Sequence, residues 1–167
     1  MHIGGIVEDD IVDCDSGVAV SLFTAGCPHR CKGCHNSILW DYNYGEDEDI
    51  KEIISRLIYL IGKNDIQRQF SVLGGEPLCP ENIEDVARII NEIRAKYPSI
   101  KIYVWTGYEF ENLPDSEELK NILNNIDVLI DGPFIEELKD TRLKLRGSSN
   151  QHIRLKSNDW KIDDDLQ

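Results

Sequence analysis

Three of the five cysteines in this chain lie close enough together to bind metal. They are Cys27, Cys31 and Cys34, with three and then two residues between neighbours. Closely spaced thiolates hold the irons of iron–sulfur clusters, and ordinary electron-transfer clusters take four cysteines. No fourth cysteine lies nearby in the sequence. We therefore expect a 4Fe–4S cluster held by three cysteines. One iron would stay open to a ligand from outside the protein, just as a catalytic zinc keeps one position open.

Two other states of these thiols stay open at this point. Zinc could bind the same three cysteines with His35 or Cys79 as its fourth ligand, or the thiols could carry no ligand. Cys14 and Cys79 are expected not to be cluster ligands. An odd number of cysteines is a poor disulfide framework, which indicates free thiols in a reducing compartment.

The charge of the chain narrows the range of its partners. Lysine and arginine number 18 against 31 aspartates and glutamates, which gives a net charge of −13. This excess of acid argues against non-specific binding to nucleic acid and against docking on an anionic membrane. The stretch from Ser16 to Trp40, which holds the cysteine cluster, contains no acidic residue. A buried strand within that stretch would explain part of the absence.

The chain also lacks the signals that direct a protein into or across a membrane. No apolar run approaches the ~18–20 residues needed to span a bilayer. The first residues have neither a basic region nor a long apolar stretch, so they do not form a secretory signal. We therefore expect a cytoplasmic protein.

Short apolar runs alternate with longer amphipathic segments, as expected for a single domain of this length. Apolar residues that recur every three or four positions indicate helices, and runs rich in β-branched and aromatic residues indicate strands. The expected elements are strand 17–24, helix 47–62, strand 69–73, helix 80–97, strand 100–105, helix 115–124 and strand 126–130. Strands separated by helices of this length favour right-handed crossovers, so the expected fold class is α/β with a parallel sheet.

Each expected strand runs into a glycine that has polar, aromatic or sulfur-bearing neighbours. These strand ends are Gly26-Cys27, Gly74-Gly75-Glu76-Pro77, Thr106-Gly107-Tyr108 and Asp131-Gly132-Pro133. Any one of them could be only a turn. Functional groups of parallel α/β folds gather at the carboxyl ends of the strands, so four such ends together predict one shared pocket.

The cysteine spacing and the glycine-rich turn resemble the motifs of radical S-adenosylmethionine (SAM) enzymes. In that family three cysteines hold three irons, and the amino and carboxylate groups of SAM chelate the fourth. Gly74-Gly75-Glu76-Pro77 is similar to the family's GGEP element, whose backbone and glutamate contact the SAM amino group, a favourable pairing of carboxylate with cationic amine. The resemblance implies further SAM contacts from Gly33, Thr106 and Asp131.

The match is closer to one branch of the superfamily, the small activases of glycyl-radical enzymes that serve anaerobic ribonucleoside-triphosphate reductase. The segments that carry it are 22–41, 73–82, 104–113, 128–134 and RGSSNQ at 146–151. Such activases are minimal radical SAM proteins. The resemblance therefore implies one radical SAM domain over 1–167 with an incomplete, partial TIM-type (βα) barrel, and residues 161–167 are expected to form a frayed tail.

The activity implied by this resemblance is reductive cleavage of SAM. A low-potential donor such as flavodoxin passes one electron to the cluster, and the C5′–S bond breaks homolytically to give methionine and a 5′-deoxyadenosyl radical. That radical takes a hydrogen atom from the Cα of one glycine in the partner reductase. The cofactors do the chemistry while the protein orients them and excludes water and oxygen.

One segment departs from the pattern of these activases. They usually carry Gly-Pro-Gly-apolar-Arg just before the first strand, where this chain has Asp15-Ser16-Gly17-Val18-Ala19. The departure bears on the identity of the partner more than on the radical chemistry. Two alternatives remain: another small radical SAM enzyme that acts on a small molecule, of the deazaguanine synthase type, and a non-catalytic zinc-binding α/β module.

Four further residues have two interpretations each. Tyr108 and Asp131 either contact SAM or belong to the turns that end their strands. Arg146 and Asn150 lie in the RGSSNQ segment, where they serve the site, the partner or only the local fold. The sequence alone does not choose between these roles.

Overall fold

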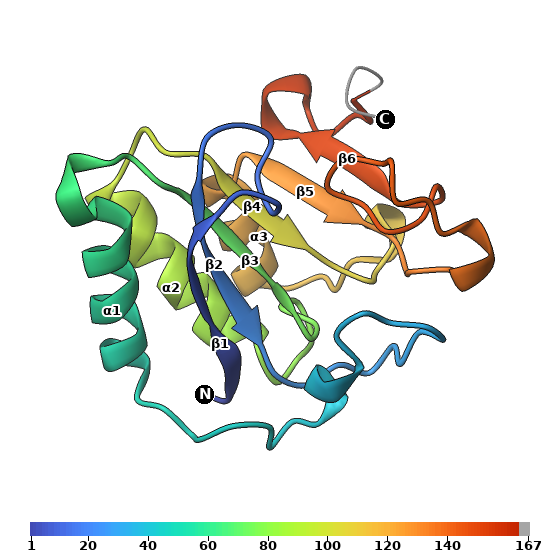
Figure 1. Ribbon diagram of the computed structural model, residues 1–167, viewed down its shortest axis with the longest axis horizontal. Coiled ribbons are helices and arrows are strands. Elements are labelled where there is room, and N and C mark those ends of the chain that lie inside the picture. Colours follow the sequence, from blue (N-terminus) through green and yellow to red (C-terminus); the bar gives the residue numbers. More distant parts are fainter. Residues whose placement is uncertain (164–167) are drawn as a thin grey trace.

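The computed structural model describes residues 1–163 and builds them around one sheet (Figure 1). The six strands lie side by side in the order of the sequence. They are β1 (Ile3–Asp10), β2 (Ala19–Thr24), β3 (Gln69–Gly74), β4 (Ile102–Trp105), β5 (Val128–Asp131) and β6 (His152–Leu155). Three helices connect the central strands: α1 (Ile50–Gly62), α2 (Ile83–Lys96) and α3 (Glu117–Asn125).

The sheet is mixed, which confirms the α/β class but shows that the expectation of a parallel sheet was wrong. Strands β2 to β5 are parallel to one another, whereas β1 is antiparallel to β2 and β6 is antiparallel to β5. The two antiparallel edge strands were not expected from the sequence. No helix of the α1–α3 type lies between β1 and β2 or between β5 and β6. A parallel pair needs a long crossover, so these neighbours reverse direction.

All three helices pack on the same face of the sheet, and the opposite face is not covered by them. Leu57 of α1, Ile90 of α2 and Ile122 of α3 share one buried cluster with strand residues such as Leu22 and Val72. The opposite face carries a smaller apolar cluster, formed by Cys14, Ala19, Tyr103, Val128, Ile130 and Ile153. The rest of that face is therefore available to line a cavity.

The helix boundaries follow from capping. The Asp49 carboxylate accepts a hydrogen bond from the backbone of Lys51 (2.7 Å), so α1 begins three residues later than its apolar pattern suggested. Helix α2 begins at Ile83 and not at Pro80. The Ser116 hydroxyl accepts from the backbone of Leu119 (3.1 Å) and caps α3.

The last described residues contact the sheet. Ile162 forms an isolated antiparallel bridge with Arg154, and the backbone N–H of Asp163 donates to the carbonyl of Ile153 (2.9 Å). The sequence predicts a frayed tail over 161–167, and residues 164–167 of that tail lie outside the described residues. Every helix within 1–163 is too short or too polar to cross a membrane.

Candidate functional site

A cavity of about 530 Å³ lies at the carboxyl ends of the parallel strands. It receives residues from the loop after β2, the turn after β3 and the ends of β4 and β5, so the shared pocket expected from the four strand ends is present. The expected site residues that line it are Cys27, Cys31, Gly33, Cys34, Gly74, Gly75, Glu76, Thr106 and Arg146. Pro77, Tyr108, Asp131 and Asn150 do not line it.

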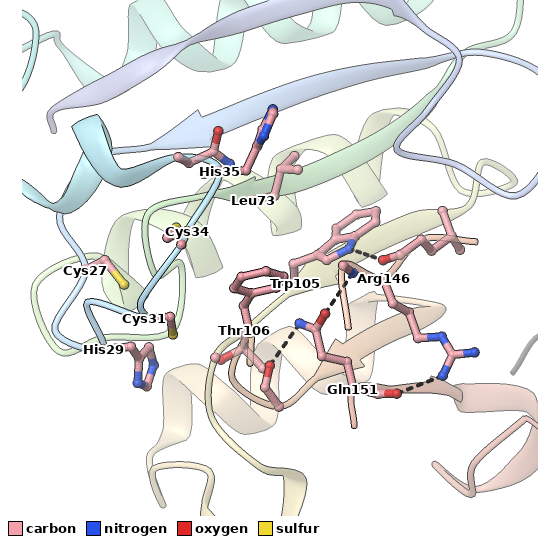
Figure 2. Close-up of a pocket in the computed structure, with 18 of the residues that line it drawn as sticks. Cys27, His29, Cys31, Cys34, His35, Leu73, Trp105, Thr106, Arg146 and Gln151 are labelled. Atoms are coloured by element: carbon pink, nitrogen blue, oxygen red, sulfur yellow. Dashed lines mark hydrogen bonds between the residues drawn. The ribbon is translucent and has the colours of Figure 1, made fainter. Parts of the chain in front are cut away.

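The three cysteines lie on one irregular loop at one side of this cavity (Figure 2). All three are free thiols. The loop turns sharply because Arg30 and Gly33 have positive φ angles of 49° and 72°. Burial raises the pKa of the Cys27 and Cys31 thiols above their ordinary value. A bound metal ion would supply the positive charge that lets such thiols act as thiolate ligands.

His35 and Cys79, the two candidates for a fourth zinc ligand, are placed apart from this group. The imidazole of His35 points away from the three cysteines (Figure 2), although the residue lines the cavity. Cys79 is fully buried and does not line the cavity. Within residues 1–163, no three His, Cys, Asp or Glu side chains converge on the position of a single metal ion. A 4Fe–4S cluster does not need such convergence, because each of its cysteines binds a different iron.

The turn after β3 needs its two glycines. Gly74 has a φ of 105°, a conformation that side chains strain. A Cβ on Gly75 would collide with the carbonyl oxygen of Gly26, because the turn packs directly against the start of the cysteine loop. The backbone N–H of Glu76 donates to that same Gly26 carbonyl (2.8 Å). The glycines therefore allow the turn and the cysteine loop to touch.

Glu76 is buried at this junction, with only 1% of its surface exposed. Oε1 accepts from the backbone of Leu78 (2.9 Å) and from the hydroxyl of Thr106 (2.8 Å). Oε2 accepts from the backbone of Gly107 (2.7 Å) and lies 2.9 Å from Nε2 of His29. The carboxylate thus joins three strand ends: those of β2, β3 and β4.

Asp131 has partners that place it outside the cavity. Its Oδ1 accepts from Nε of Arg154 (2.8 Å), and its Oδ2 accepts from the backbone of Phe110 (3.0 Å). Asn150 donates to the carbonyl of Pro133 (2.7 Å). These contacts favour a structural role for Asp131 and Asn150 over a cofactor contact.

The wall opposite the cysteines is built from the end of β4 and the RGSSNQ segment (Figure 2). Trp105 donates from Nε1 to the carbonyl of Leu145 (2.7 Å), and Arg146 donates from Nη1 to the carbonyl of Gln151 (2.9 Å). Gln151 in turn donates from Nε2 to the carbonyl of Gly132 (3.0 Å). Burial lowers the pKa of Arg146. Trp105, Arg146 and Gln151 of this wall all line the cavity, and the Arg146 guanidinium is used within the wall itself.

The segment that departs from the activase pattern is anchored beside the site. The Asp15 carboxylate accepts from the hydroxyl of Tyr103 and from Nζ of Lys101, both over 2.7 Å. Just before it, Ile11 and Val12 are 74% and 72% exposed, and Val12 lines the cavity. Val12 thus adds an exposed apolar side chain to the cavity lining, and the exposed Ile11 precedes it in the sequence.

Two residues of the site had no assigned role in the sequence. His29 lies between Cys27 and Cys31, and this position is the signal that could have pointed to it. Gln151 stood out only as part of the RGSSNQ segment, and its side chain forms three hydrogen bonds that hold the wall opposite the cysteines.

Comparison with known proteins identifies the group to which this chain belongs. The model of the 4Fe-4S single cluster domain matches residues 15–154. The anaerobic ribonucleoside-triphosphate reductase-activating protein of Salmonella typhi is 40% identical over 149 residues, which cover 87% of this chain and 94% of that protein. The protein of the same name from Enterobacteria phage T4 is 38% identical over 165 residues, or 93% and 98% of the two chains. The chain belongs to this family of activating proteins.

The family match agrees with the chemistry of the donor set. All three loop cysteines fall within the residues that match the 4Fe-4S single cluster domain. Three free thiols on one side of a cavity fit the donor set of an iron–sulfur cluster.

Proposed function

We propose that this chain activates an anaerobic ribonucleoside-triphosphate reductase through SAM and a 4Fe–4S cluster held by Cys27, Cys31 and Cys34. The observation that carries the proposal is that the three thiols and the buried Glu76 turn line one cavity. When bound, the cluster supplies the electron that breaks the C5′–S bond of SAM, so that a hydrogen atom can be taken from a glycine of the reductase.

The chain's own residues hold and orient the groups in this proposal. The backbone of Gly74 and Gly75 reaches the cavity without side chains in the way, which suits close contact with the amino group of SAM. Gly33 and Thr106 line the same space. Pro77 follows the turn and restricts its backbone. Asp131 supports the strand ends.

We further propose that residues 1–167 form one radical SAM domain with an incomplete barrel. The parallel strands with helices on one face and the cavity on the other support this. Val12 and Asp13 line the cavity, as do residues of the segment at 139–147, and we infer that the cavity mouth lies between them. A loop of a folded partner that carries a glycine would enter there, with Ile11 and Val12 providing apolar contact.

The remaining parts of the proposal concern the surroundings of the protein. A low-potential donor such as flavodoxin would deliver the electron. The cytoplasm suits five free cysteines, because thiols stay reduced there.

The test is anaerobic reconstitution followed by incubation with SAM, a reductant and the cognate reductase. We expect about four irons and four sulfides per chain, release of 5′-deoxyadenosine, and a glycine-centred doublet in the EPR spectrum of the reductase. Replacing the reductase glycine with alanine should remove the doublet and reduce SAM cleavage.

Two outcomes would replace the proposal. One zinc per chain with no SAM cleavage would favour the non-catalytic module. SAM turnover driven by a purine-like metabolite, with no radical on the reductase, would favour a small-molecule enzyme.

A further inference from the structure

We propose that His29 is a positioning residue that ties the cysteine loop to the Glu76 turn and thereby fixes the cluster ligands relative to the SAM site. The contact itself is in the structure, whereas the identity of the two bound groups rests on the proposed function. Loss of the His29–Glu76 contact would therefore change the affinity for SAM and the change that SAM causes in the EPR spectrum of the cluster.

The imidazole of His29 is held from two sides. Nε2 lies 2.9 Å from Oε2 of Glu76, and the ring meets that of Tyr108 edge to face, with centroids 4.6 Å apart and planes at 77°. The His29 side chain is 19% exposed and the Glu76 side chain 1%. A hydrogen bond so shielded from water is stronger than one at the surface.

Glu76 has no spare acceptor position in this arrangement. A carboxylate offers about four lone-pair sites. Leu78, Thr106 and Gly107 take three, and His29 takes the fourth. Three donors thus come from the turn after β3 and the end of β4, and the last comes from between two cluster cysteines.

The cysteine loop needs such a tie because its own backbone holds it weakly. No helix or strand includes residues 27–34. The backbone of Cys27 donates to Trp40 over 3.3 Å, and Cys34 donates to Cys31 over 3.1 Å. A misplacement of about 1 Å between reacting groups can cost about a hundredfold in rate, so a loop that carries cluster ligands must keep its distance from the turn that carries SAM.

The test compares His29→Gln, whose amide can donate toward Glu76, with His29→Asn, whose side chain is shorter, and with His29→Ala. The matched control is His152→Ala, which removes a histidine that does not line the cavity. Three quantities are measured: iron and sulfide per chain, the dissociation constant of SAM with the loaded protein, and the EPR spectrum of the reduced cluster with and without SAM.

We expect His29→Ala and His29→Asn to bind SAM about ten- to a hundredfold more weakly, as for the loss of one hydrogen bond to a charged group. Their cluster spectrum should change less on SAM addition, while His29→Gln recovers most of both properties. If His29 also affects cluster loading, the inference predicts less iron and sulfide in the alanine and asparagine variants and normal amounts in the glutamine variant.

Wild-type SAM affinity in a fully loaded His29→Ala protein would overturn the inference, and so would equal losses in the glutamine and asparagine variants. Tighter SAM binding by His29→Ala would also overturn it, because His29 would then compete with the SAM amino group for Glu76. Failure of the proposed function is separate: the wild-type protein itself would not take up iron or bind SAM.

Discussion

Arg154 of β6 donates from Nε to Oδ1 of Asp131 at the end of β5 over 2.8 Å, and both residues are buried. The guanidinium also lies over the ring of Phe110, 4.5 Å from its centroid, while the backbone of Phe110 donates to the other oxygen of Asp131. One buried ion pair therefore joins the last strand, the end of β5 and the segment after β4. Asp131 acts as a structural joint beside the cavity.

Asp131→Ala is predicted to lower the free energy of unfolding by about 3–5 kcal/mol, because it leaves a buried guanidinium without its main carboxylate. SAM affinity of the folded variant should stay within twofold of wild type. Urea denaturation measures the first quantity and equilibrium binding the second. Glu111→Ala, which removes the mostly exposed partner of Arg154, should cost much less. A stable Asp131→Ala protein with weakened SAM binding would assign Asp131 to the cofactor instead.

The central fold could be predicted from the sequence because β2 to β5 and the three helices have strong apolar patterns. The edge strands could not. Strand β1 contains two glycines and three acidic residues, and β6 has only four residues, including His152 and Arg154. Each edge strand has a neighbour on one side only and carries polar residues, so its hydrophobic signal is weak. Its antiparallel direction depends on loops that have no pattern.

The sequence likewise predicts some parts of the candidate site and not others. The cysteines and the GGEP turn could be found because their chemistry demands particular residue types at a fixed spacing. The donors around Glu76 could not, because Thr106 and Gly107 lie about thirty residues away and meet it only through the pairing of β3 with β4. The sequence shows which residues can form hydrogen bonds, and the fold decides which of them pair.

Glu76→Ala is predicted to weaken both the fold and SAM binding. It leaves the donors of Leu78, Thr106 and Gly107 without their acceptor, and each buried unsatisfied donor costs about 1–3 kcal/mol. We expect the free energy of unfolding of the cluster-free protein to fall by about 3–5 kcal/mol. SAM affinity should fall about ten- to a hundredfold, because the turn that lines the SAM site is no longer held to the end of β4 and to the cysteine loop.

Glu76→Gln keeps the shape of the side chain and one acceptor oxygen. Its free energy of unfolding and its SAM affinity should therefore lie between those of Glu76→Ala and wild type. Chemical denaturation and SAM titration are done on the same preparations. Unchanged SAM affinity in Glu76→Gln and Glu76→Ala would mean that the contacts of Glu76 do not hold the SAM site in place.

The triple variant Cys27→Ala/Cys31→Ala/Cys34→Ala should fold and bind no cluster. The three side chains are only partly buried, so their loss leaves the core intact. Iron and sulfide analysis after anaerobic reconstitution measures loading, and circular dichroism checks the fold. Cys79→Ala and Cys14→Ala are the controls and should load normally, because neither residue lines the cavity. A large loss in Cys79→Ala would restore the four-ligand site.

The stability of the cluster-free protein should depend on pH through Asp13, which lies in the cavity wall. Burial, followed by a hydrogen bond with the Asp10 carboxylate and its charge, raises the pKa of Asp13 from 3.8 to about 7. The folded state then binds the Asp13 proton more tightly than the unfolded chain does, so protonation of Asp13 stabilises the fold. This stabilisation is complete below pH 3.8 and is lost as the pH rises through about 7. Asp13→Asn should therefore melt at a higher temperature than wild type at about pH 8, and the difference should shrink toward about pH 5.

Asp15→Asn provides a control of opposite sign. Burial alone would raise the pKa of Asp15, but hydrogen bonds from Lys101, Tyr103 and Ser16 outweigh it and lower the pKa. A carboxyl with a lowered pKa stabilises the fold above its unfolded value and loses that effect as the pH falls. The melting temperature of Asp15→Asn should therefore drop most at about pH 8, where that of Asp13→Asn rises. Destabilisation by Asp13→Asn at that pH would show that Asp13 is ionised and stabilising in the folded protein, contrary to its raised pKa.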